Sequence, residues 1–531
     1  MLFYRISLCA AIIATTSMAF AEATTIKRSD TEILNSCSAN NERAKKIKGS
    51  FEFAYNGYKK YAFGHDELLP VSNTSSDSRN GWGASIIDSL DTMLIMGLEK
   101  DYQQALQFVK SVDFAKSRDS SKGFETNIRY LGGLLAANDL RPNRILVEKA
   151  IEVTEATLLP LFVQTATPSG RKVKVPYTYM DLNRNKPEIS NTINLAEFGT
   201  YSMEFTRLSQ VTGNPKYKAI ADDLTVAAIE QPTHMPGLFP TSWTVKPFTP
   251  VNTSTITIGG GGDSFYEYLI KNYVLQNKEN NDLLRVWQES VESIQNYMLS
   301  PAAQDSSVQF VAMISGSKVY YSSQELICFW PGNILLGITQ IQDQTTQQRF
   351  KNFADTFFNS CIETWRKTKT GVAPESWSWT PQDNQLETKL SKLFKDSLNV
   401  KKADTTSKKK GKRSSPRTFK IENAIYDLRP ETIESVFYYY RLTGDKKYQD
   451  IAWELYLAIE RFAKANSGFS RIDNVDQNPT KLQDFQESFF FAETLKYLYL
   501  IFADKECISL NNFVFNTEAH PFRLPKPIHY Q

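Results

Sequence analysis

Acidic residues recur at the predicted first turns of several apolar helices. Glu125, Asp263 and Glu431 each open a stretch with apolar residues at three-to-four spacing. Any one of them is explained as a helix cap, because a carboxylate at a helix N-terminus stabilises the macrodipole. Together they match what glycoside cleavage needs: one carboxyl group that protonates the leaving oxygen and one carboxylate that activates water.

Further charged residues lie on the same or neighbouring predicted helices: Arg129, Glu197, Glu267, Glu434, Glu487 and Glu493. Aromatic residues and repeated Gly accompany them, which capping does not require. A sugar pocket does require them, because carboxylates bind hydroxyl groups and aromatic faces bind the ring. Several acids in one pocket raise one another's pKa values, and this separates a proton donor from a base.

Helices should position these acids. Periodic apolar spacing predicts helices over 84–98, 125–138, 194–212, 263–276, 430–442, 448–463 and 486–502. Strand-like alternation is confined to short pieces such as 251–258 and 308–320. The predicted fold class is therefore all-α.

A weak internal repeat supports an ordered arrangement of these helices. Residues 208–217 and 442–448 share a Thr-Gly step followed by Lys-Tyr, and 97–102 is a looser third copy. Each copy joins one apolar helix to the next, which predicts a toroid of paired inner and outer helices. The alternative is a coincidence of C-cap glycines.

The N-terminus is typical of a secretory signal peptide. Arg5 precedes an apolar run that ends in Ala19-x-Ala21, so we expect residues 1–21 to be removed. The mature protein would be secreted. The alternative is retention in the ER or Golgi lumen by an uncleaved anchor, which the short apolar run disfavours.

Four cysteines remain after this cleavage: Cys37, Cys328, Cys361 and Cys507. An even count in an oxidising compartment is compatible with disulfides, and three pairings are open. Asn73 and Asn252 begin glycosylation sequons, which suits secretion.

A net charge of +3 gives no reason to expect a nucleic-acid partner. Residues 395–420 hold a dense Lys run without apolar periodicity, which predicts a disordered, solvated surface insertion. A nucleic-acid or membrane patch is the alternative. Lys27-Arg28 and Lys412-Arg413 are possible cleavage sites for a dibasic processing protease.

Seven segments resemble the signatures of one enzyme family, in that family's order: GWGASIIDSLDTMLIMG (81–97), FETNIRYLGGLLAA (124–137), AEFGTYSMEFTRLSQVTGNPKY (196–217), GGDSFYEYLIK (261–271), LRPETIESVFYYYRLTGDKKY (428–448), ESFFFAETLKYLYLIF (487–502) and FNTEAHPF (515–522). YAFGHDELLPVS (61–72) is similar to the family's N-terminal segment. The family is the class I α-mannosidases, glycoside hydrolase family 47, and the resemblance spans nearly all of the mature chain.

This resemblance implies an (α/α)7 barrel at 46–531, after an N-terminal extension at 22–45. We expect the protein to be a monomer. It also implies a bound Ca²⁺ and hydrolysis with inversion. Glu125 matches the family's proposed general acid, which acts through a water, and Glu431 the proposed base. Asp263 matches a third essential carboxylate whose role is debated, so the base assignment between Asp263 and Glu431 stays open. Thr517 matches the residue that holds Ca²⁺ through its carbonyl and hydroxyl, beside waters and sugar hydroxyls.

Other matches follow residue by residue. The family's pocket residues correspond to Arg129, Glu197, Glu267, Arg429, Glu434, Glu493 and Glu518, and the ring beneath the sugar corresponds to Phe489. Cys328 and Cys361 fall where the family carries a disulfide, which leaves Cys37 and Cys507 paired or free. Inversion predicts that acid and base stand about 6.5–9.5 Å apart.

Two departures concern the pocket. In QELICFWPG (324–332), Glu325 stands where the family usually has His, and Pro331 where it has a Gly-Gly pair. This leaves the shape of the loop, and any sugar contact of the His, open.

The second departure concerns specificity. Relatives resembling the endoplasmic-reticulum enzyme carry Arg just before GDSFYEY, whereas this chain has Gly262 immediately before Asp263. We therefore expect removal of several α-1,2-linked mannoses from high-mannose N-glycans rather than one, and we expect Gly262→Arg to narrow the product range.

Two other classes compete with this interpretation. One is a non-catalytic glycan-binding relative, resembling the ER-degradation-enhancing mannosidase-like proteins. The three acids and Thr517 argue against it. The other is a different α/α-barrel glycosidase, resembling glucoamylase, which would lack a use for the FNTEAHP segment.

Overall fold

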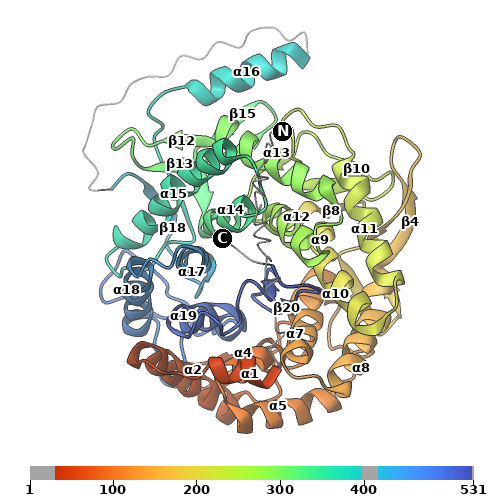
Figure 1. Cartoon of the computed structure of the whole chain (residues 1–531), viewed down its shortest axis with the longest axis vertical. Helices are drawn as coiled ribbons and strands as arrows, with labels where there is room; N and C mark the ends of the chain where they lie inside the picture. The colour runs from red at the N-terminus through yellow and green to blue at the C-terminus, as the bar shows by residue number, and fades with distance from the viewer. Residues whose placement is uncertain (1–29, 398–416, 529–531) are drawn as a thin grey trace, which may run out of the picture.

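A computed structural model describes residues 30–397 and 417–528, which form a ring of helices around a central core (Figure 1). The predicted signal peptide, residues 22–29 of the predicted extension and both dibasic sites lie outside the described residues. Among the described helices, none combines the length and the apolar composition needed to cross a bilayer.

The ring consists of inner helices, each packed against an outer partner. The inner helices are α4 (Leu90–Ile95), α7 (Gly132–Leu140), α10 (Ser202–Thr212), α12 (Asp263–Leu275), α14 (Trp330–Ile338), α17 (Glu431–Thr443) and α19 (Leu495–Phe502). Their outer partners, in the same order, are α5 (Glu99–Ser111), α8 (Arg144–Val153), α11 (Lys216–Ile229), α13 (Asn281–Tyr297), α15 (Gln344–Arg366), α18 (Lys447–Phe462) and α2 (Glu42–Tyr61). The described residues therefore contain seven pairs, the predicted (α/α)7 barrel.

Burial explains which helix lies where. Every residue of α19 is buried, and so is every residue of α12 after Asp263. A helix that is buried all round belongs inside, whereas the single apolar face of α13 places it outside. Because α19 packs on α2, the last helix of the barrel meets the first, and the ring closes.

The internal repeat is confirmed at the turns between inner and outer helices. Gly213 ends α10 and Gly444 ends α17, both in the left-handed conformation with φ of 70° and 71°. Gly97, with φ 67°, lies between α4 and α5. Gly213 and Gly444 are thus C-caps, Gly97 directly follows the C-cap Met96, and all three glycines mark the pairing of helices.

Several predicted helices are interrupted. The helix predicted over 84–98 divides into α3 (Ala84–Asp88) and α4, and the one over 194–212 into α9 (Leu195–Gly199) and α10. Residues 125–138 comprise the end of α6 (Gly123–Glu125), the π-helix η1 (Thr126–Leu131) and most of α7. The remaining short helices are α1 (Asp30–Ser36), α16 (Gln385–Ser397), η2 (Thr154–Leu158), η3 (Leu159–Leu161), η4 (Glu325–Phe329) and η5 (Phe490–Thr494). The π-helices η1 and η5 precede inner helices, where π-bulges often accompany functional sites.

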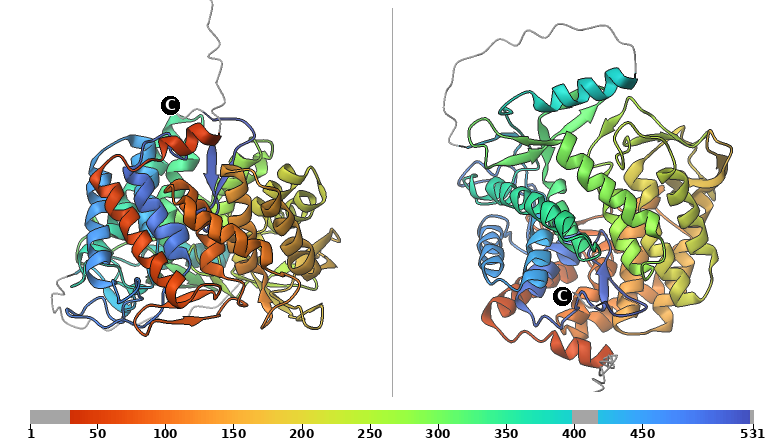
Figure 2. Two further views of the ribbon diagram at one scale, coloured as in Figure 1. Left: turned by 90° about the horizontal axis from the view of Figure 1, so that it is seen from below. Right: turned by 45° about the horizontal axis from the view of Figure 1, so that its top comes forward.

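Short antiparallel strands connect the helices, and many of them gather at one end of the barrel (Figure 2, left). They are β1 (Glu67–Leu69), β2 (Thr74–Ser76), β3 (Ser121–Lys122), β4 (Phe162–Ala166), β5 (Lys172–Pro176), β6 (Tyr179–Asp181), β7 (Lys186–Pro187), β8 (Thr192–Asn194), β9 (Ser242–Thr244), β10 (Thr249–Pro250), β11 (Thr255–Ile256), β12 (Leu299–Pro301), β13 (Gln309–Val311), β14 (Met313–Ser315), β15 (Lys318–Tyr320), β16 (Ser322–Gln324), β17 (Ser376–Ser378) and β18 (Lys420–Asn423). Of the predicted strand at 251–258, only β11 forms.

A C-terminal hairpin of β19 (Phe513–Phe515) and β20 (Pro521–Arg523) enters the barrel from the end at which the C-terminus lies (Figure 2, left). Its turn is fixed from within, because Asn516 Oδ1 accepts hydrogen bonds from the backbone N–H groups of Glu518 and His520, at 2.9 and 2.8 Å. The hairpin packs on α7 and α12. It thereby carries Thr517 into the barrel.

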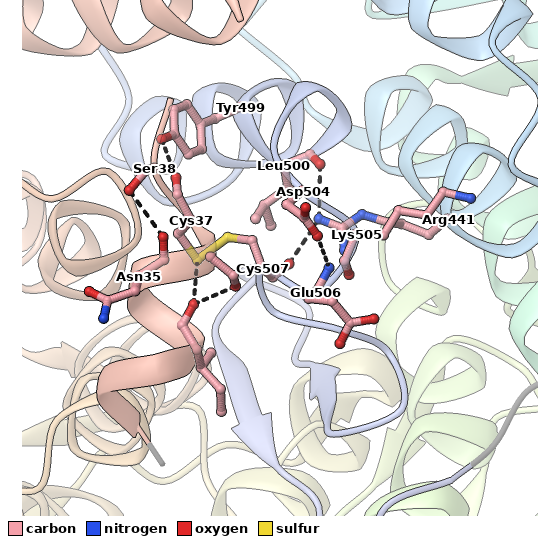
Figure 3. The surroundings of a disulfide bond; sticks show 12 residues. Asn35, Cys37, Ser38, Arg441, Tyr499, Leu500, Asp504, Lys505, Glu506 and Cys507 are labelled. Atoms are coloured by element: carbon pink, nitrogen blue, oxygen red, sulfur yellow. Dashed lines mark hydrogen bonds between the residues drawn. A yellow bond between two sulfur atoms is a disulfide. The ribbon is translucent and has the colours of Figure 1, made fainter. Parts of the chain in front are cut away.

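Two disulfides form among the described residues. Cys328 pairs with Cys361, as the resemblance implied, and joins η4 to α15. Cys37 pairs with Cys507, which settles the pairing left open by the sequence (Figure 3). This second bond ties the segment after α1 to the segment after α19, so the two ends of the ring are joined covalently.

The boundaries of two predicted segments shift. The N-terminal extension was expected to reach residue 45, but α2 already begins at Glu42. Of the predicted insertion 395–420, residues 398–416 lie outside the described residues. At its edges α16 continues to Ser397, and Phe419 is buried beside Arg417, which pairs with Asp476 at 2.9 Å. The structured chain therefore extends further into this interval from both sides than predicted.

Candidate active site

The three predicted catalytic acids lie at the starts of inner segments of the barrel. Glu125 ends the short α6 ahead of η1, Asp263 is the first residue of α12, and Glu431 is the first residue of α17. Inner and outer helices alternate along the chain and run antiparallel, so the inner helices begin at one end of the barrel. All three acids are partly exposed, whereas the residues that follow on α12 and α17 are buried. The acids therefore face the open end of the core.

Glu125 is surrounded by cations. Its Oε2 lies 3.0 Å from Arg79 Nη1 and 2.8 Å from Arg129 Nε. Burial opposes ionisation, but the charges of Arg79, Arg129 and Lys122 outweigh it and lower the pKa of Glu125 to about 2. Glu125 is therefore ionised near neutral pH in the ligand-free protein.

Asp263 has the opposite electrostatic setting. Its Oδ1 accepts a hydrogen bond from the backbone N–H of Ser264 at 3.0 Å. Burial, together with the charges of Glu267 and Glu431, raises the pKa of Asp263 to about 7, against the lowering effect of that hydrogen bond and of Arg429. Two of the three acids thus have well-separated pKa values, as a proton donor and an ionised partner require.

Phe489 is flanked by two arginines. The guanidinium carbons of Arg129 and Arg429 lie 5.7 and 5.6 Å from its ring centre, within cation–π distance. Phe489 is only 5% exposed. The predicted floor residue and two predicted pocket residues therefore form one unit.

A chain of alternating charges links these arginines across the loops: Glu125, Arg79, Glu487, Arg471, Asp427, Arg429 and Glu375. Each link is an N···O contact of at most 4.0 Å. Each carboxylate has a cationic neighbour, so the arginines are held in place by ion pairs. Of these residues, Arg79, Arg471, Asp427 and Glu375 were missed because they lie in loops with no periodic pattern.

A deeper group of acids surrounds Lys271, which was also missed. Lys271 is fully buried, pairs with Glu267, and lies 3.0 Å from Glu434. Burial raises the pKa of Glu434 to about 8, although Lys271 opposes the shift. Lys271 could have been recognised from the sequence. Its neighbours on α12 are largely apolar, and a Lys buried among them must be paired with an acid.

Two further predicted pocket acids lie near Arg129. Glu518 pairs with Arg129 directly. Burial raises the pKa of Glu493 well above its usual range, and the neighbouring charges of Glu518 and Glu431 add to this. The predicted acids therefore crowd together, and the cations beside them do not neutralise all of them.

Glu197 lies at the edge of this group. Its Oε1 is 3.0 Å from Lys122 Nζ, and its Oε2 accepts a hydrogen bond from the Thr178 hydroxyl at 3.1 Å. Lys122 also contributes to the low pKa of Glu125. Glu197 is thus connected to the candidate acid through one shared cation.

Thr517 lies in the turn of the C-terminal hairpin. It is partly exposed, although residues 513–516 and 518–520 are buried. Its backbone N–H donates to the Tyr268 hydroxyl at 3.2 Å. Among the described residues, no group of three His, Cys, Asp or Glu side chains converges as direct metal ligands. A cation here would need the oxygen atoms of Thr517 together with water or sugar.

The structure corrects the test proposed at Gly262. A Cβ atom at Gly262 would lie 2.3 Å from the carbonyl oxygen of Thr257, so any side chain there displaces backbone. The residue that precedes GDSFYEY is in fact Gly261. A Cβ there would lie 2.8 Å from Asn194 Nδ2, a side-chain atom that can move, although φ is +97°.

The predicted sequons lie on turns. Asn73 is partly buried, with φ 59°, between β1 and β2, and Asn252 is exposed between β10 and β11.

Paired acids of contrasting pKa, next to an aromatic ring inside an all-helical barrel, define a class of protein: the glycoside hydrolases. The family model described as glycosyl hydrolase family 47 matches residues 50–524. The chain belongs to this family.

Individual relatives agree along almost the full length. The mannosyl-oligosaccharide alpha-1,2-mannosidase of Penicillium citrinum is 34% identical over 506 residues, covering 92% of this chain and 93% of that protein. The mannosyl-oligosaccharide 1,2-alpha-mannosidase of Arabidopsis thaliana is 35% identical over 492 residues, covering 91% of this chain and 79% of that protein. The solved structure of alpha-1,2-mannosidase from Trichoderma reesei has a TM-score of 0.80 at 34% identity, covering 92% of this chain and all of that one.

Proposed function

We propose that this glycoside hydrolase removes terminal α-1,2-linked mannoses from high-mannose N-glycans, with inversion and with the help of Ca²⁺. The proposal is carried by the contacts of the three acids with the two arginines that flank Phe489. Glu125 pairs with Arg129, and Asp263 and Glu431 interact with each other and with Arg429. The names of the relatives support the substrate.

In the proposed reaction, water attacks the anomeric carbon while the leaving oxygen is protonated. Glu431 is the base that removes a proton from this water. Phe489 supports the sugar ring from below, and Arg129 and Arg429 position that ring and bind hydroxyl groups. Because the attacking water needs room between the sugar and the base, acid and base should stand about 6.5–9.5 Å apart.

The proton donor has two candidates. Glu125 is the family's acid, but with a pKa of about 2 it can donate only if sugar binding raises that pKa strongly. Asp263, with a pKa of about 7, already carries a proton near neutrality. We retain Glu125 as the acid that acts through a water and keep Asp263 as the specific alternative.

A substrate that needs little acid assistance separates these roles. Glu125→Gln, Asp263→Asn and Glu431→Gln would each be assayed on α-1,2-mannobiose and on α-mannosyl fluoride. Loss of the acid should be largely rescued on the fluoride, because fluoride leaves with little help, whereas loss of the base should not. If Glu125→Gln kept the full rate on mannobiose, the acid assignment would be wrong. Proton NMR of the first-formed mannose tests inversion.

The residues around Thr517 fit Ca²⁺. Ca²⁺ accepts carbonyl, hydroxyl and water oxygens in flexible geometry, which suits Thr517. Burial and, to a smaller extent, neighbouring acids raise the pKa values of Glu434 and Glu493, and a divalent cation nearby would favour their ionised forms. When bound, Ca²⁺ would fix the orientation of sugar hydroxyls at the base of the pocket.

We further propose broad trimming, because the segment 259–262 carries no long cationic side chain. A time course on a nine-mannose glycan tests this: products should fall below eight mannoses. Accumulation of a single eight-mannose isomer would contradict it. A complete lack of hydrolysis in Ca²⁺, with glycan binding retained, would favour the non-catalytic relative instead.

Secretion, signal cleavage near Ala21, glycosylation at Asn73 and Asn252, a single catalytic domain from residue 46 and a monomeric state are also proposals. Intact mass and light scattering of the secreted protein test them together.

A further inference from the structure

Glu325 lies against the proposed base, at the position where the sequence departs from the family pattern. It begins η4 and is only 1% exposed. Its Oε1 accepts two hydrogen bonds from Thr432, at 3.1 Å from the backbone N–H and 2.7 Å from the hydroxyl. Thr432 directly follows Glu431 in the first turn of α17. Glu325 therefore caps the helix that presents Glu431.

The second oxygens of the two glutamates lack other partners. Among the described residues, Glu325 Oε2 and Glu431 Oε2 are both buried and have no donor. The two carboxyl groups lie within hydrogen-bonding reach of each other. Two ionised carboxylates would repel in this position, whereas one shared proton satisfies both oxygens. A neutral carboxyl group has one O–H donor and one carbonyl acceptor, so Glu325 can accept from Thr432 and donate to Glu431.

The surroundings favour a protonated Glu325. Burial raises its pKa well above the usual range, and the charge of Glu431 adds to this, although the bonds from Thr432 oppose it. Tyr426 interacts with both members of the pair, and Arg429 interacts with Glu431. Three further acids interact with Glu431: Asp263, Glu434 and Glu493.

Besides α17, the elements packed against η4 are α14, β16 and α15. The sequences of α14 and β16 hold no titratable side chain. On α15, which the Cys328–Cys361 disulfide attaches to η4, Asp355 interacts with Tyr439 and Lys351, and Glu363 with Lys367.

We propose that Glu325 is a positioning residue for Glu431: the two side chains share one proton, which fixes one carboxylate oxygen of Glu431 and leaves the other free to activate water. This inference rests on the proposed role of Glu431 as the base. At high pH the pair of Glu325 and Glu431 loses its shared proton. The two ionised carboxylates then repel each other, and Glu431 is no longer held in position.

A measurement without substrate tests the shared proton. Infrared difference spectra of wild type against Glu325→Gln should show the C=O stretch of a buried protonated carboxyl group at neutral pH, and Glu431→Gln should shift this band. Absence of the band in both comparisons would overturn the proposal. Because no substrate is involved, this result is independent of whether the protein trims mannose.

Kinetics test the consequence. Glu325→Gln keeps an acceptor for Thr432 and a donor for Glu431, so kcat at the optimum should stay within about threefold, while the pH profile of kcat/KM loses the limb that belongs to the pair. Glu325→Ala removes both contacts, and kcat should fall about 10- to 100-fold with little change in KM, as for a mispositioned catalytic group. Thr432→Val removes the hydroxyl that donates to Glu325 but keeps Glu325 itself. Its kcat should lie between those of the two Glu325 variants.

Asp343→Ala is the matched control, because Asp343 caps the outer helix α15 through Thr346 at 2.8 Å, away from the pair. It should lower the melting temperature without changing the pH profile. A Glu325→Gln profile that superimposes on wild type would contradict the proposal. So would a Glu325→Ala variant whose kcat falls no more than that of the control.

Discussion

Arg79 Nη1 lies 3.0 Å from Glu125 Oε2 and joins a loop between β2 and α3 to the proposed acid. The same guanidinium reaches Glu487 at 3.2 Å, which makes it the first link of the charge chain. A residue outside every predicted helix thus controls the ionisation of a residue at the core of the site.

Replacing Arg79 by Met should therefore raise the pKa of Glu125 above about 2 and reduce kcat/KM. A higher pKa by itself favours proton donation by Glu125, but we expect a loss of about 10- to 100-fold because the contact that positions Glu125 is removed. Carboxyl ¹³C titration and mannobiose hydrolysis measure the two effects. Arg144→Met, at a side chain that is 90% exposed, is the control and should leave both unchanged.

The raised pKa of Asp263 predicts a pH dependence of stability. Between its usual pKa of 3.8 and about 7, the folded protein binds a proton at Asp263 that the unfolded chain has lost. The contribution of this group to the free energy of unfolding is therefore present at low pH and is lost as pH rises through about 7. Asp263→Asn should flatten that part of the profile in thermal melts of the ligand-free protein. Parallel profiles for variant and wild type would contradict the raised pKa.

Ca²⁺ should stabilise the protein as well as support activity. At about 100 times its dissociation constant, a bound ion adds roughly 2.7 kcal/mol to the free energy of unfolding. Chelator should remove this gain together with activity, and Ca²⁺ should restore both. Thr517→Val should weaken binding of Ca²⁺ in calorimetry by at least about tenfold, because a ligand oxygen is lost. Equal affinity in wild type and variant would exclude Thr517 as a ligand.

The two glycines before Asp263 should respond differently to Arg. Gly262→Arg places a Cβ atom 2.3 Å from the Thr257 carbonyl, so we expect a poorly folded protein. Gly261→Arg meets a movable side chain and costs about 1–2 kcal/mol for its left-handed backbone. If a cation here restricts the glycan, Gly261→Arg should stop the digestion of a nine-mannose glycan earlier than wild type. If a folded Gly261→Arg variant gave the same products as wild type, this position would play no part in specificity.

The disulfide between Cys37 and Cys507 closes the ring across a sequence separation of 470 residues. Replacing both cysteines by Ser should lower the free energy of unfolding by about 2–5 kcal/mol. Because the bond lies between α1 and the segment after α19, kcat should not change. Differential scanning calorimetry and mannobiose kinetics check the two expectations, and a large loss of kcat would show that closure of the ring also shapes the site.

The helical class and the pairing of helices illustrate what local pattern can predict, whereas the number of pairs, seven, was implied only by the family resemblance. Apolar periodicity and the C-cap glycines at 97, 213 and 444 are local features, so the all-α class and the pairing of helices followed from the chain itself. The interruptions at Ser89 and Thr200 did not, because tertiary contacts decide where an inner helix breaks.

The sequence by itself also determined the family, and with it which acids to examine, because their order along the chain carries that information. Only the tertiary structure decided their ionisation and partners. The low pKa of Glu125 depends on Arg79, and the cap on α17 depends on Glu325, which precedes Glu431 by 106 positions (431 − 325). Such charges act through space at distances of a few ångströms, and no spacing along the chain records them.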